Sequence, residues 1–370
     1  MRLTLVIPAL SSGGAERVMA TLANAWAKRG WAVTLLTFDD GRRPPFYPLD
    51  PAIVQRPLDL EGVSPTPIHG LVNNLRRWRT VRRAVVASRP DAVVSFMDQT
   101  NVLVLLATRG LRLPVVVAEH NDPAQQPVGP VWERLRLALY PRAATVVMLS
   151  ATAAAFFPSA IRRRVRVVPN PVVLDQDPGG AEAETNSDAE GGGQTLVAVG
   201  RLSEQKGFDL LLDAFSVIAP KHQGWRLDIW GEGPLRPDLE RQRDALGLGE
   251  RVGLPGTSDR LHRRLAEADL FVLSSRYEGF PMALCEAMAS GLPVIAYDCP
   301  SGPREIVRPG IDGVLVPATD VPALAAALDR LMGDPAERRR LAQRAPEVMD
   351  RFGLETVLGM WDDVLREATR

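Results

Sequence analysis

Short apolar segments alternate with helical patterns along the first half of the chain. Residues 3–7 form a continuous apolar run, a Ser/Gly loop follows at 11–14, and residues 15–29 repeat apolar positions at helical spacing up to Gly30. Another apolar run covers 31–38. This order predicts a strand, a helix and a second parallel strand, because strands buried on both faces read as unbroken apolar runs. Further strands are predicted at 92–96, 115–118, 145–149 and 165–168.

The same pattern restarts after an acidic, glycine-rich segment at 175–193, whose composition is typical of a linker. Beyond it, strands are predicted at 195–199, 226–230, 271–274 and 293–296, with helices at 208–218 and around 284–289. We therefore expect an α/β protein with two doubly wound, Rossmann-like domains that face each other across a cleft. The expected divisions are an N-terminal domain at 1–174, the linker at 175–193, a C-terminal domain at 194–350 and a final helix at 351–370.

Composition narrows the class of protein. The 370 residues include 44 Lys and Arg and 44 Asp and Glu, so no net charge attracts a nucleic acid. The two cysteines, Cys285 and Cys299, match neither a zinc motif nor a disulfide framework. We find no signal-peptide pattern and no apolar run of the roughly 20 residues that a membrane span needs. We expect a protein of the cytoplasm, or one that lies on the cytoplasmic face of the inner membrane.

The segment 200–207 combines glycines with two cations. It lies between a predicted strand and a predicted helix, and it contains Arg201 and Lys206. Glycines let the backbone approach an anion closely, and a helix N-terminus offers unpaired N–H groups. The segment is therefore a candidate for diphosphate binding, although two cations in a solvated surface loop would give the same pattern.

Two glutamates, Glu278 and Glu286, lie on either side of a predicted helix start. Pro281 suits that start, so Glu278 is expected in the loop and Glu286 about one turn into the helix. Carboxylates beyond the carboxyl ends of parallel strands are placed to accept hydrogen bonds from sugar hydroxyls. A favourable contact with the helix dipole explains either glutamate alone, but it does not explain the spaced pair.

Together these motifs resemble those of the retaining glycosyltransferases of family 4, which have the two-domain GT-B fold. The resemblance spans nearly the whole chain and rests on Ser-Gly-Gly-Ala-Glu-Arg at 12–17, Gly-Arg with a lysine at 200–206, Gly-Glu-Gly-Pro at 231–234 and the glutamate pair. It implies an enzyme that moves a hexose or N-acetylhexosamine from a nucleotide-diphosphate sugar, with the anomeric configuration retained. Uridine is the base that most such enzymes use, and guanosine and adenosine donors also occur. In this fold the final helix, at 351–370, crosses back onto the N-terminal domain.

The resemblance also implies roles for individual residues. Arg201 and Lys206 would hold the donor diphosphate, Glu286 the ribose hydroxyls and Glu278 the donor sugar. Other donor-binding positions would approach the ligand from both domains, and these are Gly13, Gly14, Gly279, Phe280, Pro281 and Met282. Because cations and helix N-termini would stabilise the leaving diphosphate, neither a metal nor a cofactor is expected.

Within that family, the N-terminal half is similar to bacterial N-acetylgalactosaminyltransferases that extend polyprenyl-linked oligosaccharides. The similar segments are Ser-Phe-Met-Asp-Gln-Thr-Asn at 95–101 and Glu-His-Asn at 119–121. By resemblance His120 is a catalytic candidate beside Glu278, Arg201 and Lys206, and it would lie at the donor sugar and the acceptor hydroxyl. A hydrogen-bonded loop histidine is the alternative. Asp98 and Glu119 are secondary candidates, since Asp98 would equally cap the next helix.

A basic amphipathic helix is expected between the first strands. Its apolar positions recur at helical spacing at Leu71, Leu75, Trp78, Val81 and Val85. Its candidate acceptor-binding or lipid-binding positions are Arg76, Arg77, Arg79, Arg82 and Arg83. Such a helix suits an anionic membrane or the pyrophosphate of a polyprenyl carrier, and a basic helix packed on its own domain has the same pattern. A second arginine run, at 162–164, is interpreted as a solvated edge.

Two signals are discounted. Asp175 and Asp177 have the form of a metal-binding pair, but they lie in the linker, where acidic residues need no special cause. Gly231-Glu232-Gly233 begins a dinucleotide fingerprint, but Arg236 stands in place of its third glycine. Two other functions remain open: a nucleotide-sugar epimerase of the same fold, which would consume the donor without an acceptor, and a catalytically silent subunit. The expected partners are a nucleotide-diphosphate sugar, a glycan or lipid-linked acceptor and the inner-membrane surface.

Overall fold

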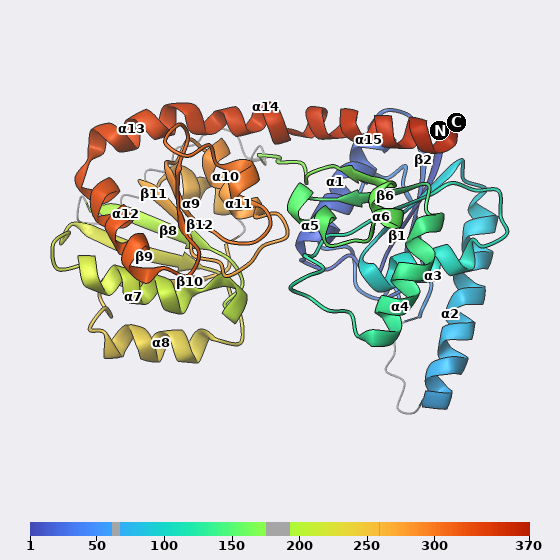
Figure 1. Cartoon of the computed structure of the whole chain (residues 1–370), viewed down its shortest axis with the longest axis horizontal. Coiled ribbons are helices and arrows are strands. Elements are labelled where there is room, and N and C mark those ends of the chain that lie inside the picture. The colour runs from blue at the N-terminus through green and yellow to red at the C-terminus, as the bar shows by residue number, and fades with distance from the viewer. Residues whose placement is uncertain (61–66, 175–192, 259) are drawn as a thin grey trace. The chain divides into compact units, whose positions relative to one another are not determined.

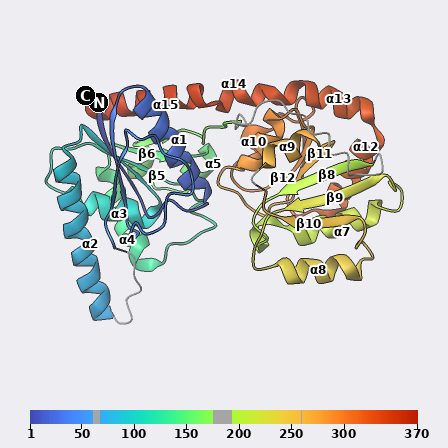
Figure 2. The same cartoon turned by 180° about the vertical axis from the view of Figure 1, so that it is seen from behind.

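The computed structural model of the chain describes residues 1–60, 67–174, 193–258 and 260–370. It divides into two compact units: unit 1 comprises Met1–Pro171 and Glu355–Arg370, and unit 2 comprises Val172–Leu354. Each unit has one sheet with helices on both of its faces, as Figure 1 and Figure 2 show. The predicted linker, with Asp175 and Asp177, lies outside the described residues except for Gly193.

Unit 1 is built on a parallel sheet of seven strands in the order β3-β2-β1-β4-β5-β6-β7. The strands are β1 (Arg2–Ile7), β2 (Ala32–Thr37), β3 (Val54–Pro57), β4 (Ala92–Phe96), β5 (Val115–Ala118), β6 (Thr145–Met148) and β7 (Val165–Val167). Every residue of β4, β5 and β6 is buried. This explains why the inner strands are continuous apolar runs in the sequence, since helices cover both of their faces.

The helices of unit 1 come from both ends of the chain. They are α1 (Gly14–Lys28), α2 (Pro67–Ser88), α3 (Asp98–Ala107), α4 (Pro130–Leu139), the 3₁₀ helix η1 (Tyr140–Arg142), α5 (Ala151–Ala155), α6 (Ser159–Arg162) and α15 (Leu354–Thr369). Trp361 of α15 lies edge-on to Trp26 of α1, with 6.1 Å between ring centroids, and stacks on Phe96 of β4 at 6.0 Å. Arg29 binds Glu355 and Asp362 at 2.7 and 2.8 Å. The last helix therefore completes the core of the unit that holds the first strand.

Unit 2 has a parallel sheet of six strands in the order β10-β9-β8-β11-β12-β13. The strands are β8 (Gln194–Val199), β9 (Trp225–Trp230), β10 (Val252–Gly256), β11 (Leu270–Leu273), β12 (Val294–Asp298) and β13 (Val314–Pro317). The helices are η2 (Glu204–Lys206), α7 (Phe208–Ile218), α8 (Arg236–Ala245), α9 (Leu261–Ala266), α10 (Met282–Ala289), α11 (Pro303–Ile306), α12 (Val321–Gly333), α13 (Pro335–Arg344), η3 (Ala345–Glu347) and α14 (Val348–Phe352). Two Rossmann-like sheets confirm the predicted α/β class.

Both sheets reverse their strand order beside their first strand. In unit 1 the chain moves from β1 outward to β2 and β3 and then returns to the other side of β1 as β4. In unit 2 the corresponding neighbours are β8 and β11. The loops that leave two such strands diverge to opposite faces of the sheet, so a crevice opens at their carboxyl ends, and ligands of open α/β sheets bind there.

Candidate functional site

The loop after β8 meets the loop after β11 at the switch point of unit 2. Lys206 Nζ donates to Glu278 Oε1 at 2.7 Å, and Ser275 Oγ donates to the same oxygen at 2.5 Å. Only 4% of Glu278 is exposed, whereas 20% of the Lys206 side chain is exposed. The cation and the carboxylate that the sequence singles out, 72 residues apart, form one ion pair.

Arg276 ties the same two loops together. Its backbone N–H donates to Gln205 O at 2.8 Å, and its guanidinium binds both carboxylate oxygens of Asp209, at 2.8 and 2.6 Å. Burial would raise the pKa of Asp209, but the guanidinium holds that pKa below its usual value. The sequence pattern did not single out Arg276. Its position two residues before Glu278, in the same loop, was the available signal.

Glycines permit the close approach of these loops. Gly207 has a φ of +61°, and a Cβ at this position would lie 2.1 Å from Ser274 O. A Cβ at Gly231, with a φ of +142°, would lie 1.9 Å from Gly200 O. Neither position accepts a side chain without a backbone shift. The glycines of the 231–234 motif therefore pack the loop after β9 against the loop after β8.

The other predicted donor-binding residues of unit 2 occupy different environments. Arg201 is exposed at the start of the β8 loop, and Glu286 is 2% exposed within α10. Phe280 packs edge-on against Phe352 with 5.4 Å between centroids, so its ring serves the core of unit 2. The neighbouring predicted residues are half-buried Gly279, buried Pro281, which is the N-cap of α10, and half-buried Met282.

In unit 1, the loop after β1 presents two glycines with different surroundings. A Cβ at Gly13 would lie 2.1 Å from a carboxylate oxygen of Glu16, and this carboxylate also accepts from Ser11 Oγ at 3.0 Å. At Gly14 nothing lies within 4 Å of an added Cβ, and the residue is exposed. Glu16 thus covers the backbone at Gly13, whereas the backbone at Gly14 stays open to approach.

His120 follows β5 and packs against the last residue of β4. Its ring centroid lies 4.0 Å from that of Phe96. Both ring nitrogens are buried, and neither has a hydrogen-bond partner within the described residues. Burial lowers the pKa of His120 to about 3, so the ring is neutral near pH 7. Since buried polar groups are rarely left unpaired, this imidazole is a candidate contact for a ligand hydroxyl.

A buried polar network lies beside His120. Glu119 is 2% exposed, accepts a hydrogen bond from the Tyr140 hydroxyl, and has its Oε1 3.6 Å from Arg136 Nη1. Asn101 Nδ2 donates to the same hydroxyl at 3.1 Å. Burial raises the pKa of Glu119 to about 7, although the charge of Arg136 acts in the opposite direction. Because Arg136 is a residue of α4, the network fixes this helix to the carboxyl end of β5.

The structure divides the arginines of α2 into two groups. Arg77 and Arg82 are half-buried: Arg77 Nε donates to Leu60 O at 3.0 Å, and Arg82 Nη1 donates to Ala107 O at 2.7 Å. The exposed group comprises Arg76, Arg79 and Arg83. Two exposed apolar residues of the same helix, Leu75 at 45% and Val86 at 52%, lie beside this group in the helical projection.

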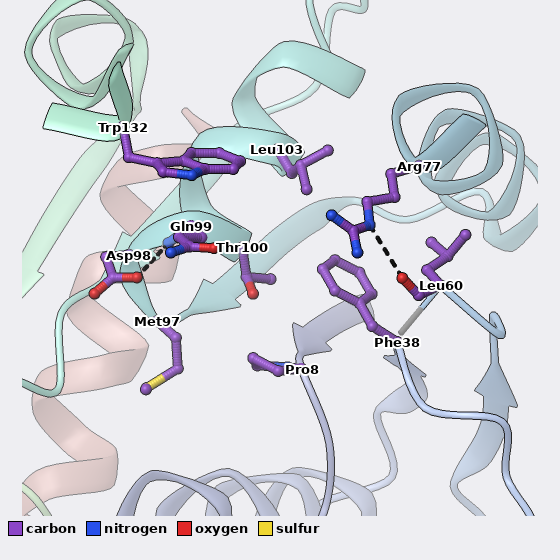
Figure 3. Close-up of a pocket in the computed structure, with 10 residues that line it drawn as sticks. All are labelled: Pro8, Phe38, Leu60, Arg77, Met97, Asp98, Gln99, Thr100, Leu103 and Trp132. Atoms are coloured by element: carbon purple, nitrogen blue, oxygen red, sulfur yellow. Dashed lines mark hydrogen bonds between the residues drawn. The ribbon is translucent and has the colours of Figure 1, made fainter. Parts of the chain in front are cut away.

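A pocket of about 460 Å³ lies at the switch point of unit 1 (Figure 3). Pro8 follows β1, Met97 follows β4, and both line the pocket. Met97 has a φ of +75°, a conformation that is uncommon without a glycine and that recurs at functional sites. Further walls come from the side chains of Phe38, Leu103, Trp132, Arg77, Asp98 and Gln99. Of these, the sequence pattern singled out Arg77 and Asp98.

Two kinds of feature are absent from the described ranges. There, no group of three or more His, Cys, Asp or Glu side chains is placed to hold a metal ion. No helix of the same ranges combines the length and the apolar character that a membrane crossing requires.

Comparisons with known proteins agree with this geometry. Residues 12–176 match the family model described as Glycosyltransferase Family 4, and residues 182–348 match the model described as Glycosyl transferases group 1. The chain is 27% identical to GalNAc-alpha-(1->4)-GalNAc-alpha-(1->3)-diNAcBac-PP-undecaprenol alpha-1,4-N-acetyl-D-galactosaminyltransferase of Campylobacter jejuni, over 99% of each protein. It is 29% identical to the amylovoran biosynthesis glycosyltransferase AmsD of Erwinia amylovora, over 98% of this chain and 99% of AmsD. A stretch of 176 residues is 42% identical to an exopolysaccharide phosphotransferase of Streptomyces coelicolor, covering 47% of this chain and 19% of that protein.

Solved structures show the fold. Sucrose-phosphate synthase from Thermosynechococcus elongatus superposes with a TM-score of 0.83 at 22% identity, covering 99% of this chain and 98% of that one. HepE of Anabaena, in complex with UDP, superposes with a TM-score of 0.80 at 20% identity, covering 99% and 100%. The sheets, the switch-point loops and the two matched domains together place the chain in the glycosyltransferases of the family 4 and group 1 type, enzymes with the GT-B fold.

Proposed function

We propose that this glycosyltransferase moves a hexose or N-acetylhexosamine from a uridine-diphosphate sugar to a glycan acceptor on a polyprenyl pyrophosphate carrier. The observation that carries the proposal is the 2.7 Å contact of Lys206 with Glu278 at the switch point of unit 2. A cation for a diphosphate and a carboxylate for sugar hydroxyls are adjacent there, as a nucleotide sugar requires. The names of the relatives support the two substrates: HepE was solved with UDP and with UDP-glucose, and the Campylobacter enzyme acts on an undecaprenol-linked glycan.

The donor is held by charges of unit 2. Lys206, with Arg201 from the same loop, binds the diphosphate, and Glu286 binds the ribose hydroxyls. As Lys206 turns to the phosphates, Glu278 becomes available to the hydroxyls of the donor sugar, beside the backbone of 279–282. The two cations stabilise the charge that develops on the leaving diphosphate, so the reaction needs no metal and retains the anomeric configuration.

Unit 1 supplies the acceptor side. The neutral imidazole of His120, whose nitrogens are buried, takes its hydrogen-bond partner from a substrate hydroxyl. Gly14, which is open to approach, offers its backbone N–H to the phosphates, and Gly13 shapes the same turn. Because the buried imidazole is neutral, it can form a hydrogen bond with a substrate hydroxyl without first separating from an ionic partner.

The exposed group of α2, Arg76, Arg79 and Arg83, binds an anionic membrane at the cytoplasmic face of the inner membrane, where a polyprenyl carrier resides. Each cation near an anionic surface contributes about 1 kcal/mol, and Leu75 and Val86 add apolar contact beside them. Arg77 and Arg82 are half-buried and donate to backbone carbonyls of unit 1, so the proposal assigns the membrane contact to the three exposed arginines.

The donor assignment is tested by thermal unfolding with UDP, GDP and ADP and their sugars. UDP at about 100 times its dissociation constant should stabilise the protein by about 2.7 kcal/mol, and Arg201→Ala/Lys206→Ala should lose this effect. Lys221→Ala/Arg241→Ala, which removes two exposed cations elsewhere in unit 2, is the matched control and should keep it. A stabilisation by GDP or ADP in place of UDP would refute uridine as the base of the donor. No stabilisation by any nucleotide would favour the alternative that the protein is a catalytically silent subunit.

The reaction is tested by product analysis. Donor consumption should require an acceptor, the product should keep the anomeric configuration, and EDTA should leave the rate unchanged. Consumption without an acceptor would identify an epimerase instead.

Membrane binding is tested with vesicles rich in phosphatidylglycerol. They should retain the wild type at low salt, whereas Arg76→Gln/Arg79→Gln/Arg83→Gln should be released. The control is a variant in which the three exposed arginines at 162–164 are changed to Gln, and it should stay bound to the vesicles. Equal release of both variants would refute the assignment of the membrane contact to α2.

A further inference from the structure

The two carboxylate oxygens of Glu278 have different surroundings. Oε1 accepts from Lys206 Nζ at 2.7 Å and from Ser275 Oγ at 2.5 Å. Oε2 accepts no hydrogen bond from the residues that the structure describes. The side chain is only 5% exposed, so water covers little of it. Because nearly buried charged groups are normally paired, Oε2 is the oxygen that a hydroxyl of a ligand would satisfy.

The two donors to Oε1 differ in their freedom to leave it. The Lys206 side chain is 20% exposed and has a long, flexible stem, and the proposed function assigns its ammonium group to the diphosphate. Ser275 is fully buried, and its short side chain reaches Glu278 from three residues away in the same loop. When Lys206 turns to the phosphates, Ser275 is therefore the donor that stays on Oε1.

This hydroxyl controls the rotation of the carboxylate. The last torsion of a glutamate side chain has no sharp staggered minima, so hydrogen bonds decide which way each oxygen faces. With Oε1 held by Ser275, Oε2 faces away from that hydroxyl and stays open to a ligand. Without the hydroxyl, Lys206 would be the remaining donor to the carboxylate, and the carboxylate would turn as the lysine moves.

The loop that carries Glu278 has other anchors. The backbone N–H of Arg276 donates to Gln205 O at 2.8 Å, and Gln205 Nε2 donates to Tyr277 O at 3.1 Å. The backbone N–H of Glu278 donates to a carbonyl of the loop after β12 at 3.2 Å. Loss of the Ser275 hydroxyl should therefore release the carboxylate while the backbone of the loop stays in place.

We infer that Ser275 is a positioning residue of the transfer reaction: it holds Glu278 Oε1 while the donor is bound, so that Oε2 faces the hydroxyls of the donor sugar. The inference rests on the proposed function, in which Lys206 binds the diphosphate and Glu278 binds the sugar. Ser275 touches neither part of the donor and acts through Glu278. Its loss should therefore weaken the contribution of the sugar to binding more than that of the nucleotide.

Isothermal titration calorimetry measures the ratio between the dissociation constants of a UDP-sugar and of UDP. The probes are UDP-glucose, UDP-galactose and their N-acetyl forms, and the one that binds the wild type most tightly is used with the variants. A hydrogen bond to a charged group is worth about 10-fold in affinity, so Glu278→Ala should raise the ratio by about that factor. Ser275→Ala should raise it by about 3- to 10-fold. Ser275→Cys, which fills the same space with a weak donor, should do the same.

A double variant separates action through Glu278 from an independent role. Ser275→Ala/Glu278→Ala should have the ratio of Glu278→Ala alone, because the serine hydroxyl then has no carboxylate to hold. The control is Ser216→Ala, which removes a hydroxyl that donates to Asp213 O within α7 at 2.7 Å. Its ratio should equal that of the wild type.

Three outcomes are decisive. A change of the ratio below about 2-fold in both Ser275→Ala and Ser275→Cys would overturn the inference and show that the hydroxyl only supports the loop. A ratio in the double variant well above that of Glu278→Ala would show that Ser275 acts independently of the carboxylate. In both cases UDP still binds and this inference fails alone, whereas a wild type that binds neither UDP nor a UDP-sugar contradicts the proposed function.

Discussion

Replacing Glu119 by Gln removes a carboxyl group whose pKa is raised by burial from 4.5 to about 7. The folded chain binds the proton more tightly than the unfolded chain does, so protonation of this carboxyl stabilises the fold. That stabilisation is fully present below about pH 4.5 and is lost as the pH rises through about 7. The Glu119→Gln variant carries no titrating group at this position and lacks this dependence.

The size of the effect follows from the two pKa values. Each pH unit between them contributes about 1.4 kcal/mol, so roughly 3 kcal/mol is involved, and most of it is lost between pH 5 and pH 8. Solvent screening takes little from this figure because Glu119 is 2% exposed. For a domain of this size, about 2–4 °C of unfolding midpoint corresponds to each kcal/mol, so the expected shift is about 5–10 °C.

Thermal unfolding of the wild type and of Glu119→Gln at pH 5, 6, 7 and 8, at constant ionic strength, measures this difference. The midpoint of the wild type should fall relative to that of the variant as the pH rises. His120, whose pKa burial lowers to about 3, is present in both proteins, so its contribution cancels. A midpoint difference that stays constant over the four pH values would refute the raised pKa and show that Arg136 keeps Glu119 ionised throughout.

Three further substitutions probe the two units. Gly207→Ala forces a Cβ to within 2.1 Å of Ser274 O at a φ of +61° and should cost more than about 2 kcal/mol in urea unfolding; a cost under about 0.5 kcal/mol would contradict the geometry. Trp361→Ala should lower the stability of unit 1 by about 3–5 kcal/mol and Trp361→Phe by much less, as differential scanning calorimetry will show. Lys206→Met leaves the buried Glu278 carboxylate without its cation, although Ser275 still donates to it, and should cost about 3 kcal/mol. The double variant Lys206→Met/Glu278→Gln should restore most of this loss; additive losses would show that the pair is not coupled.

The inner strands of both sheets, and the helices packed on them, were predictable because a short apolar run or a helical repeat of apolar residues defines each one without help from distant segments. The strands at 92–96 and 115–118 and the helix at 208–218 have the predicted bounds. The strands that the sequence did not indicate are edge strands: β3 is exposed at all four of its residues, and β10 and β13 contain proline. An edge strand needs neither an apolar run nor a full ladder of hydrogen bonds, so its pattern is weak.

The site shows a similar division. Lys206 and Glu278 were identified because glycines and a helix-start proline mark the loops that carry them. Trp132 and Arg136 were not, because an amphipathic helix shows that one face is buried but not which strand end or pocket it covers. The two roles of the arginines of α2 were equally hidden, since the acceptors of Arg77 and Arg82 are backbone carbonyls of distant segments.

The aromatic contacts of Trp361 have a consequence for synthesis of the protein. Trp26 and Phe96 emerge early from the ribosome, but the helix that covers them follows the whole of Val172–Leu354. At about 5–20 residues per second, the first sheet waits on the order of ten seconds or more with an uncovered aromatic surface, while the second unit has its full sequence and folds. The nascent chain thus begins its N-terminal unit first and finishes it last, and chaperones that bind exposed aromatic groups have that interval in which to act.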